Sequence, residues 1–211
     1  MPPDATPRKP LPHVLWLGGS TCAGKTSVAR LLADEHGLRL YSCDDFFEDH
    51  RRRASPERHP GFCRIMDLSG PELCALPVDA QAEALTAFYR DQMEMIIEDL
   101  LELDGPVLAE GSGLLPELVA PLLTGRSKAL WMIATPGFRR RTYPDRGAWV
   151  REMIAEMDDP DQAFERWMAR DDLLAARRAE QAAALGLNVM TVDGSHSIAE
   201  TAARAWRIFD D

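Results

Sequence analysis

The feature that most constrains this chain is a glycine-rich segment between an apolar run and a helical pattern. The apolar run begins at Val14, and the segment Gly19-Ser-Thr-Cys-Ala-Gly24-Lys25-Thr26 has the spacing G-x-x-x-x-G-K-[ST]. Glycines let the backbone wrap closely around a polyphosphate, and the N–H groups that open the following helix point toward its oxygens. The spacing therefore predicts a loop that binds the phosphates of a nucleotide, with a strand before it and a helix after it.

The residues of this loop have distinct expected roles. Lys25 adds a mobile cation at the phosphates, and Thr26 offers a hydroxyl to Mg²⁺. The predicted cofactors are therefore ATP and Mg²⁺. We expect the nucleotide to contact a continuous run of residues, namely Gly19, Ser20, Thr21, Cys22, Ala23, Gly24, Lys25, Thr26 and Ser27.

Length and composition indicate a soluble protein with one domain. The chain has 211 residues, of which 45% are hydrophobic and 27% are charged, as is ordinary for a globular protein. We expect a flexible lead-in over 1–12 and a single domain over 13–211. The net charge of -10 argues against nucleic acid as the main partner.

The cysteines and the apolar runs indicate where the protein resides. The four cysteines have none of the short paired spacings of zinc or redox sites, so we expect reduced thiols in the cytoplasm. No apolar run approaches the roughly 20 residues needed to span a bilayer. We expect no membrane partner, and either a monomer or a homodimer.

Hydrophobic periodicity alternates between strands and helices along the chain. Strands are expected from residue 14 and over 38–42, 106–109, 128–134 and 187–192, and helices over 25–35, 79–103, 114–123, 148–157, 160–185 and 198–209. This alternation predicts an α/β chain with the three-layer P-loop NTPase fold, in which a parallel five-stranded sheet has helices on both faces. Ligands of such sheets gather at the carboxyl ends of the strands.

Two further segments stand apart from this alternation. Residues 50–70 show no clear periodicity and include three consecutive arginines, so we expect a long irregular insert on the acceptor side of the site. Residues 138–151 begin with a basic run and are expected to form a lid-like segment.

Acidic residues follow two of the expected strands. Asp44 and Asp45 come after the second strand, and we expect one of them to cap the next segment while the other faces the site. We favour Asp44 as the group that orients or deprotonates the acceptor hydroxyl. Glu110 ends the third strand and is expected to hold Mg²⁺ directly or through water.

Arginines provide candidates for neutralising charge in the transition state. Arg139, Arg140 and Arg141 follow the fourth strand; we expect at most two to act and choose Arg139 and Arg140, with Arg146 as an alternate. A solvated face is the other interpretation of such a run. The candidates for binding the acceptor are Asp44, Asp45, Phe47, Arg51, Arg90 and Glu110.

Taken in order, four motifs resemble those of the uridine kinase and nicotinamide riboside kinase group of P-loop kinases. They are the 19–26 loop, the Cys-Asp-Asp-Phe-Phe run at 43–47, the Glu-Gly-Ser-Gly-Leu-Leu run at 110–115 and the arginines at 139–141. The resemblance implies that Asp44 is the base, that Glu110 is linked to Mg²⁺ and that the arginines belong to a lid. The opening of the loop also resembles chloramphenicol phosphotransferase-like kinases.

The expected function is an ATP- and Mg²⁺-dependent transfer of the γ-phosphate to a hydroxyl of a small acceptor, with a nucleoside-like acceptor as one candidate. The sequence departs from the kinase group at Glu48-Asp49, in the 50–70 insert and in the 143–185 helices, so the acceptor stays open. Three alternatives remain: an antibiotic-modifying phosphotransferase, a nucleotide-hydrolysing ATPase without a small-molecule acceptor, and a non-catalytic nucleotide-binding module.

Overall fold

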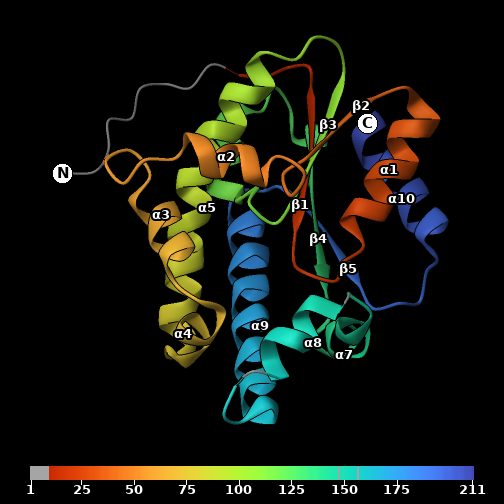
Figure 1. Ribbon diagram of the computed structural model, residues 1–211. Coiled ribbons are helices and arrows are strands. Elements are labelled where there is room, and N and C mark those ends of the chain that lie inside the picture. Colours follow the sequence, from red (N-terminus) through yellow and green to blue (C-terminus); the bar gives the residue numbers. More distant parts are fainter. Residues whose placement is uncertain (1–9, 147, 156) are drawn as a thin grey trace.

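A parallel sheet lies at the centre of the computed structural model, which describes residues 10–146, 148–155 and 157–211 (Figure 1). In this described part of the chain, five strands pair in the order β2-β3-β1-β4-β5, and every pairing is parallel. The strands are β1 (Val14–Gly19), β2 (Arg39–Ser42), β3 (Val107–Glu110), β4 (Ala129–Ala134) and β5 (Asn188–Val192). The predicted five-stranded parallel sheet is confirmed.

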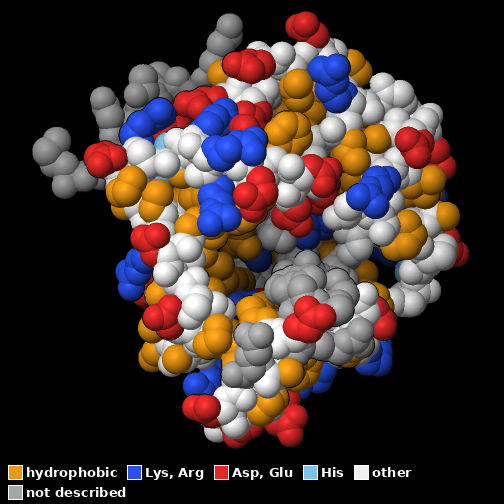
Figure 2. Space-filling view, in the orientation of Figure 1, with side chains coloured by type: hydrophobic (Ala, Val, Ile, Leu, Met, Phe, Trp, Pro, Cys, Tyr) orange, Lys and Arg blue, Asp and Glu red, His pale blue; other side chains and the backbone are white. Residues whose placement is uncertain are grey.

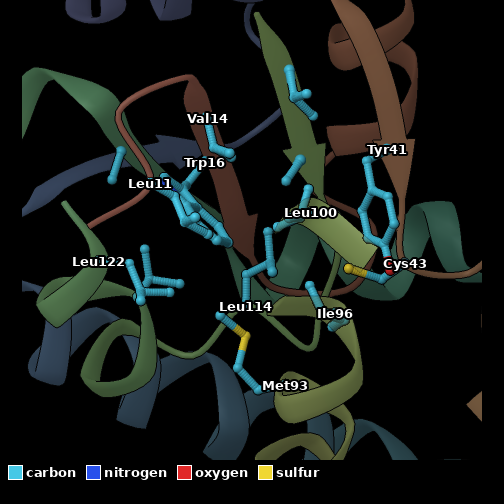
Figure 3. Close-up of a cluster of buried hydrophobic side chains, with 14 of the residues drawn as sticks. Leu11, Val14, Trp16, Tyr41, Cys43, Met93, Ile96, Leu100, Leu114 and Leu122 are labelled. Atoms are coloured by element: carbon cyan, nitrogen blue, oxygen red, sulfur yellow. The ribbon is translucent and has the colours of Figure 1, made fainter. Parts of the chain in front are cut away.

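Alternate residues of the strands enter two separate hydrophobic clusters. Trp16 and Trp131 belong to the cluster on one face of the sheet, which Figure 3 shows with Met93, Ile96 and other side chains. Their strand neighbours on the opposite face join a second cluster, to which Leu17, Leu108, Leu130 and Met132 belong. Side chains of a strand alternate between faces, so these nearly continuous apolar runs produce a sheet that is buried on both sides.

Helices cover both faces. The helices α1 (Lys25–His36) and α10 (Ile198–Asp210) pack on one face, while α5 (Val78–Leu101), α6 (Pro116–Val119) and α9 (Pro160–Ala184) pack on the other (Figure 1). Gly37, with a φ of 64°, ends α1 in the left-handed conformation that favours glycine. The two helical layers and the sheet make the predicted three-layer architecture.

The expected irregular insert is wrong, because residues 50–70 are largely helical. They contribute to α2 (Phe47–Arg53), α3 (Pro60–Asp67) and the start of α4 (Gly70–Ala75). These helices are too short to show a sustained period in the sequence. Burial of α3 comes from α5, since Phe62 stacks on Phe88 with ring centroids 4.6 Å apart, whereas Cys74 of α4 is buried in a cluster with Trp167 of α9.

The expected lid-like segment is also helical. It contains most of α7 (Pro136–Thr142), a 3₁₀ turn (Tyr143–Arg146) and the start of α8 (Ala148–Ala155), while residue 147 lies outside the described residues. The side chain of Arg146 lies outside them as well. Two further 3₁₀ turns, Ala120–Leu122 and Arg126–Lys128, precede β4.

The start of the described chain bears on the expected flexible lead-in over 1–12. Leu11 is buried and its N–H donates to the carbonyl oxygen of Leu122 over 2.9 Å, so the packed chain begins before residue 13. Residues 1–9 of the expected lead-in lie outside the described residues.

Basic and acidic side chains are interspersed on the face shown in Figure 2. Among the helices that the structure describes, none is both long enough and apolar enough to cross a membrane.

Candidate active site

The glycine-rich loop has a backbone that few side chains would permit. Gly19 and Gly24 have φ angles of 133° and 76°, and Cys22 is the one non-glycine residue in the described chain with a positive φ, at 59°. A Cβ at Gly19 would lie 2.0 Å from the carbonyl oxygen of Met132. Strained backbone of this kind is retained where the surrounding structure imposes it, commonly at ligand sites.

Lys25 lies at the centre of the loop. Its Nζ donates to the carbonyl oxygen of Ser20 over 2.8 Å and to Oγ of Ser112 over 3.3 Å. Ser20 is fixed in turn, because its Oγ accepts a hydrogen bond of 2.8 Å from the N–H of Ala134. The ammonium group therefore lies between the loop and the segment that follows β3.

Glu110 brings three elements together beside this lysine. Its Oε1 accepts hydrogen bonds from Oγ1 of Thr26 over 3.0 Å and from Oγ of Ser42 over 2.7 Å, and the residue is 2% exposed. Thr26 opens α1 and Ser42 ends β2, which pairs with β3 in parallel register at Glu110. Parallel pairing thus places a carboxylate next to the hydroxyl of the loop.

The donor set of Thr26 and Glu110 fits Mg²⁺. This ion takes hard oxygen ligands and is usually bound by one or two carboxylates together with waters and substrate phosphates. Within the described ranges, no three His, Cys, Asp or Glu side chains are grouped so that they could hold a metal without other ligands. The pair therefore suits an ion whose remaining ligands come from a nucleotide and from water.

A cavity of about 200 Å³ lies over these groups. Its described lining includes Lys25, Thr26, Glu110 and Ser112, with Asp44 on the side that follows β2. The structure thus brings together the loop, the predicted Mg²⁺ residues and the predicted base. Asp45 is exposed and does not line this cavity.

Burial keeps the neighbouring thiol neutral. Desolvation, and then the negative charges of Glu110 and Asp44, raise the pKa of Cys43 well above its ordinary value. The Cys43 side chain also lies against the turn after β3, where a Cβ at Gly111 would be 2.6 Å from its Sγ. The thiol therefore contributes packing rather than a charge at this edge of the sheet.

A second cavity, of about 230 Å³, adjoins the first. Asp44 and Ser112 line both cavities, and the second continues between α5 and α9. Its other described lining residues are Thr21, Leu73, Leu85, Tyr89, Tyr143, Trp167, Arg170, Asp171, Leu174 and Arg178. The charged residues of α9 were not predicted, although Arg170, Asp171, Leu174 and Arg178 have the three- and four-residue spacing of one helix face.

The predicted lid arginines join α7 to α9. Arg139 is 1% exposed, donates to the carbonyl oxygen of Ala134 over 2.9 Å and pairs with Asp172. Arg140 pairs with Glu165, with 2.9 Å between Nη2 and Oε2. Neither side chain is part of the described lining of the two cavities, and the role of these arginines at the phosphates stays a prediction.

Three residues predicted to bind the acceptor also lie away from the two cavities. Phe47 packs in the cluster of Phe62, with ring centroids 6.0 Å apart. Arg51 is exposed and its Nη1 lies 3.7 Å from Glu48. Arg90 pairs with Glu117 over 2.8 Å at a third cavity, which shares Leu174 and Arg178 with the second. Burial in an apolar cluster or pairing with a nearby carboxylate explains each position.

Comparison with known proteins supports the fold. No protein-family model matches the chain, and no curated protein matches it. Shikimate kinase from Acinetobacter baumannii, solved in complex with shikimate, is 18% identical, with 94% of this chain and 92% of that chain covered and a TM-score of 0.52. An uncharacterised protein from Eubacterium ventriosum ATCC 27560 is 11% identical, with 94% and 98% covered and a TM-score of 0.50. The three-layer P-loop fold is confirmed.

Proposed function

We propose that this protein is an ATP- and Mg²⁺-dependent phosphotransferase that moves the γ-phosphate to a hydroxyl group of a small acceptor. The observation that carries the proposal is the pair of adjoining cavities that share Asp44 and Ser112. One cavity has the groups that bind a polyphosphate, and the other has aromatic and charged walls suited to a small molecule. A transferase needs both compartments, with a carboxylate between them.

The donor half consists of Lys25, Thr26 and Glu110. Lys25 balances the negative charge of the phosphates, and its partners Ser20 and Ser112 hold its ammonium group at the mouth of the loop. Thr26 and Glu110 would hold Mg²⁺, which when bound neutralises charge on the phosphate oxygens. The buried hydrogen bonds to Glu110 fix that carboxylate before any ligand arrives.

The acceptor half is organised around Asp44. Its carboxylate accepts the proton of the acceptor hydroxyl as the oxygen attacks the γ-phosphorus, and the bond from that phosphorus to the oxygen of ADP breaks. Asp44 is preferred over Asp45 because only the former belongs to the described lining of both cavities. Arg170 and Arg178, which line the second cavity, are better placed than Arg139 and Arg140 to supply positive charge there.

A screen of acceptors tests the proposal. ADP formation from ATP would be followed with nucleosides, sugars, vitamins, hydroxy acids and antibiotics of the chloramphenicol and aminoglycoside types, each with and without Mg²⁺. We expect ADP formation that needs both Mg²⁺ and one class of acceptor. ADP formation at the same rate without any acceptor would instead support the nucleotide-hydrolysing ATPase, and inertness toward every acceptor would support a non-catalytic module.

A further inference from the structure

The charged residues of the second cavity divide into an ion pair and an arginine without a direct ion pair. Asp171 accepts on both oxygens: Arg170 donates to Oδ1 from Nε over 3.0 Å and from Nη2 over 2.8 Å, and Thr21 donates to Oδ2 over 2.8 Å. The Arg170 guanidinium also lies over the Trp167 ring, 4.2 Å from its centroid. This pair is therefore neutral as a whole, and its hydrogen bonds connect α9 to the phosphate loop.

Arg178 makes no direct ion pair of this kind, although a side-chain hydrogen bond with Tyr89 and the more distant charge of Asp171 both favour its charged form. It is 4% exposed, its Nη2 donates to the carbonyl oxygen of Ser112 over 3.0 Å, and its Cζ lies 5.3 Å from the centroid of the Tyr89 ring. Among the described residues, no carboxylate oxygen lies within 4.0 Å of its nitrogens, and its buried Nε has no hydrogen-bond partner.

An unpaired guanidinium in a buried position is unfavourable, because the charge loses its hydration without gaining a counter-ion. Burial accordingly lowers the pKa of Arg178 from its ordinary value. Arginine nevertheless remains protonated in proteins. Because Asp171 is already paired with Arg170, an anion in direct contact with Arg178 would stabilise its charge further. Arg178 lines both the second cavity and a larger one of about 550 Å³. Of these two, only the second cavity is also lined by Asp44 in the described chain, so an anion there would lie in the same cavity as the proposed base.

We infer that the cavity between α5 and α9 binds the acceptor and that Arg178 pairs with a carboxylate of that acceptor, which is thus a small hydroxylated carboxylic acid. The inference rests on the proposed function and names the substrate class of the same site. One guanidinium without an ion pair matches the single charge of a carboxylate better than the charge of about -1.5 to -2 on a phosphate monoester. Pairing the carboxylate with Arg178 orients the molecule so that its hydroxyl can reach Asp44.

The size of the cavity agrees with a small acceptor. Its volume of about 230 Å³ is below the roughly 300–1,000 Å³ of common ligand pockets. A single ring or a short chain fits this space. The aromatic side chains of Tyr89, Tyr143 and Trp167 in the lining favour contact with the carbon skeleton of such a molecule.

Binding to the protein loaded with Mg²⁺ and ADP tests the inference. The probes are three hydroxy acids and their neutral amides: lactate and lactamide, mandelate and mandelamide, and 4-(hydroxymethyl)benzoate and its amide. Calorimetric titration is expected to show at least one acid binding about tenfold or more tightly than its amide, as is typical of a charge-assisted contact. Equal affinity for the acid and the amide in all three pairs would overturn the inference, and this comparison needs no variant.

Variants of two neighbouring arginines localise the effect. Arg178→Met is expected to abolish the preference for the acid, and Arg178→Lys to retain part of it. Arg177→Met is the matched control, because Arg177 is exposed and lies 3.6 Å from Asp79; it should keep the full preference. A preference that persists in Arg178→Met would contradict the inference.

Nucleotide binding separates this inference from the proposed function. If Arg178→Met weakens the binding of Mg²⁺-ADP as strongly as Lys25→Met does, Arg178 contacts the donor and the inference is wrong. If the unaltered protein binds no Mg²⁺-ADP, the proposed function itself fails. Tight Mg²⁺-ADP binding without any preference for acids would support the donor half of the site and reject only the assignment of the acceptor.

Discussion

Thr26 Oγ1 donates a hydrogen bond to Glu110 Oε1 over 3.0 Å, which joins the first turn of α1 to the end of β3. The two residues are 84 positions apart in the chain, and the parallel pairing of β1 with β3 brings their elements together. Because Ser42 donates to the same oxygen, the carboxylate is fixed from two sides. This arrangement leads to a prediction about the metal.

Replacing Glu110 with glutamine should raise the Mg²⁺ concentration needed for half-maximal turnover by about 10–100-fold, as is common when a group at a metal site is altered. Glutamine can still accept the hydrogen bonds from Thr26 and Ser42, so the fold should persist. A Mg²⁺ titration of initial rates checks this. Glu117→Gln, which affects contacts with Arg90 and Gln181 outside the two cavities, is the control. An unchanged Mg²⁺ requirement in Glu110→Gln would remove Glu110 from the metal site.

Asp44→Asn should lower kcat by about 100-fold or more, the usual contribution of a general base, while the KM for ATP stays near its original value. An amide cannot accept the proton of the acceptor hydroxyl. Steady-state kinetics of both variants, Asp44→Asn and Asp45→Asn, provide the measurement. The second variant should keep most of the activity, since Asp45 is outside the described lining of both cavities. The reverse order of effects would transfer the role of base to Asp45.

Gly18→Ala should destabilise the protein by about 1–3 kcal/mol, the usual cost of overpacking a core. A Cβ at Gly18 would lie 2.4 Å from Nε1 of Trp131 and 2.8 Å from the carbonyl oxygen of Leu114, and these two atoms are hydrogen-bonded over 2.9 Å. Gly125→Ala, where the nearest atom is 4.0 Å away, should change stability by less than about 0.5 kcal/mol. Urea unfolding of both variants measures the two changes in stability. Equal stabilities of Gly18→Ala and Gly125→Ala would show that β1 shifts to accommodate the methyl group.

The stability of the protein should fall in acid partly through Asp99. Burial alone raises the pKa of Asp99, but hydrogen bonds from His50, Tyr41 and Arg53 outweigh it and hold the pKa below the ordinary 3.8. A carboxyl with a lowered folded pKa stabilises the protein above pH 3.8 and loses this contribution as pH falls through the folded value.

The Asp99→Asn variant tests this source of acid sensitivity. It should be less stable than the unaltered protein at neutral pH, and its free energy of unfolding should depend less steeply on pH below 3.8. Urea unfolding at a series of pH values provides the slope. A slope as steep as that of the unaltered protein would show that other carboxyl groups dominate.

The sheet and the loop could be predicted because their signals are local. The apolar runs that become β1 and β4 are continuous, and the spacing from Gly19 to Thr26 specifies the turn between a strand and a helix. The order of parallel strands places their carboxyl ends at one edge, so the proximity of Asp44 and Glu110 to the loop also followed from the sequence.

The short helices of the insert escaped prediction for a physical reason. Phe47 of α2 and Phe62 of α3 pack against α5, and Cys74 of α4 packs against Trp167 of α9, so the stability of these helices comes from tertiary contacts that a short window does not show. One local signal was present at the start of α4. Ser69 and Glu72 form a capping box, in which each side chain accepts a hydrogen bond from the other residue's backbone N–H.

The acceptor side of the site was the least predictable. Arg178 belongs to a long helical pattern in which arginine usually indicates an exposed face, and only the packing of α9 beside α5 makes it buried. Acceptor binding was predicted instead for Arg51 in the basic run at 51–53. Pairing with acidic neighbours accounts for the arginines of this run. Arg53, for example, pairs with Asp99 over 2.6 Å.

The fate of the γ-phosphate tests the central claim most directly. The unaltered protein or the Lys25→Met variant would be mixed with ATP, Mg²⁺ and the acceptor found by the screen. Phosphorus NMR would then follow the phosphorus-containing substrates and products over time. The account predicts that ADP and a phosphate ester of the acceptor appear in equal amounts, and that Lys25→Met slows both by about 100–1,000-fold. Release of the γ-phosphate only as inorganic phosphate, at a rate independent of the acceptor, would contradict the account.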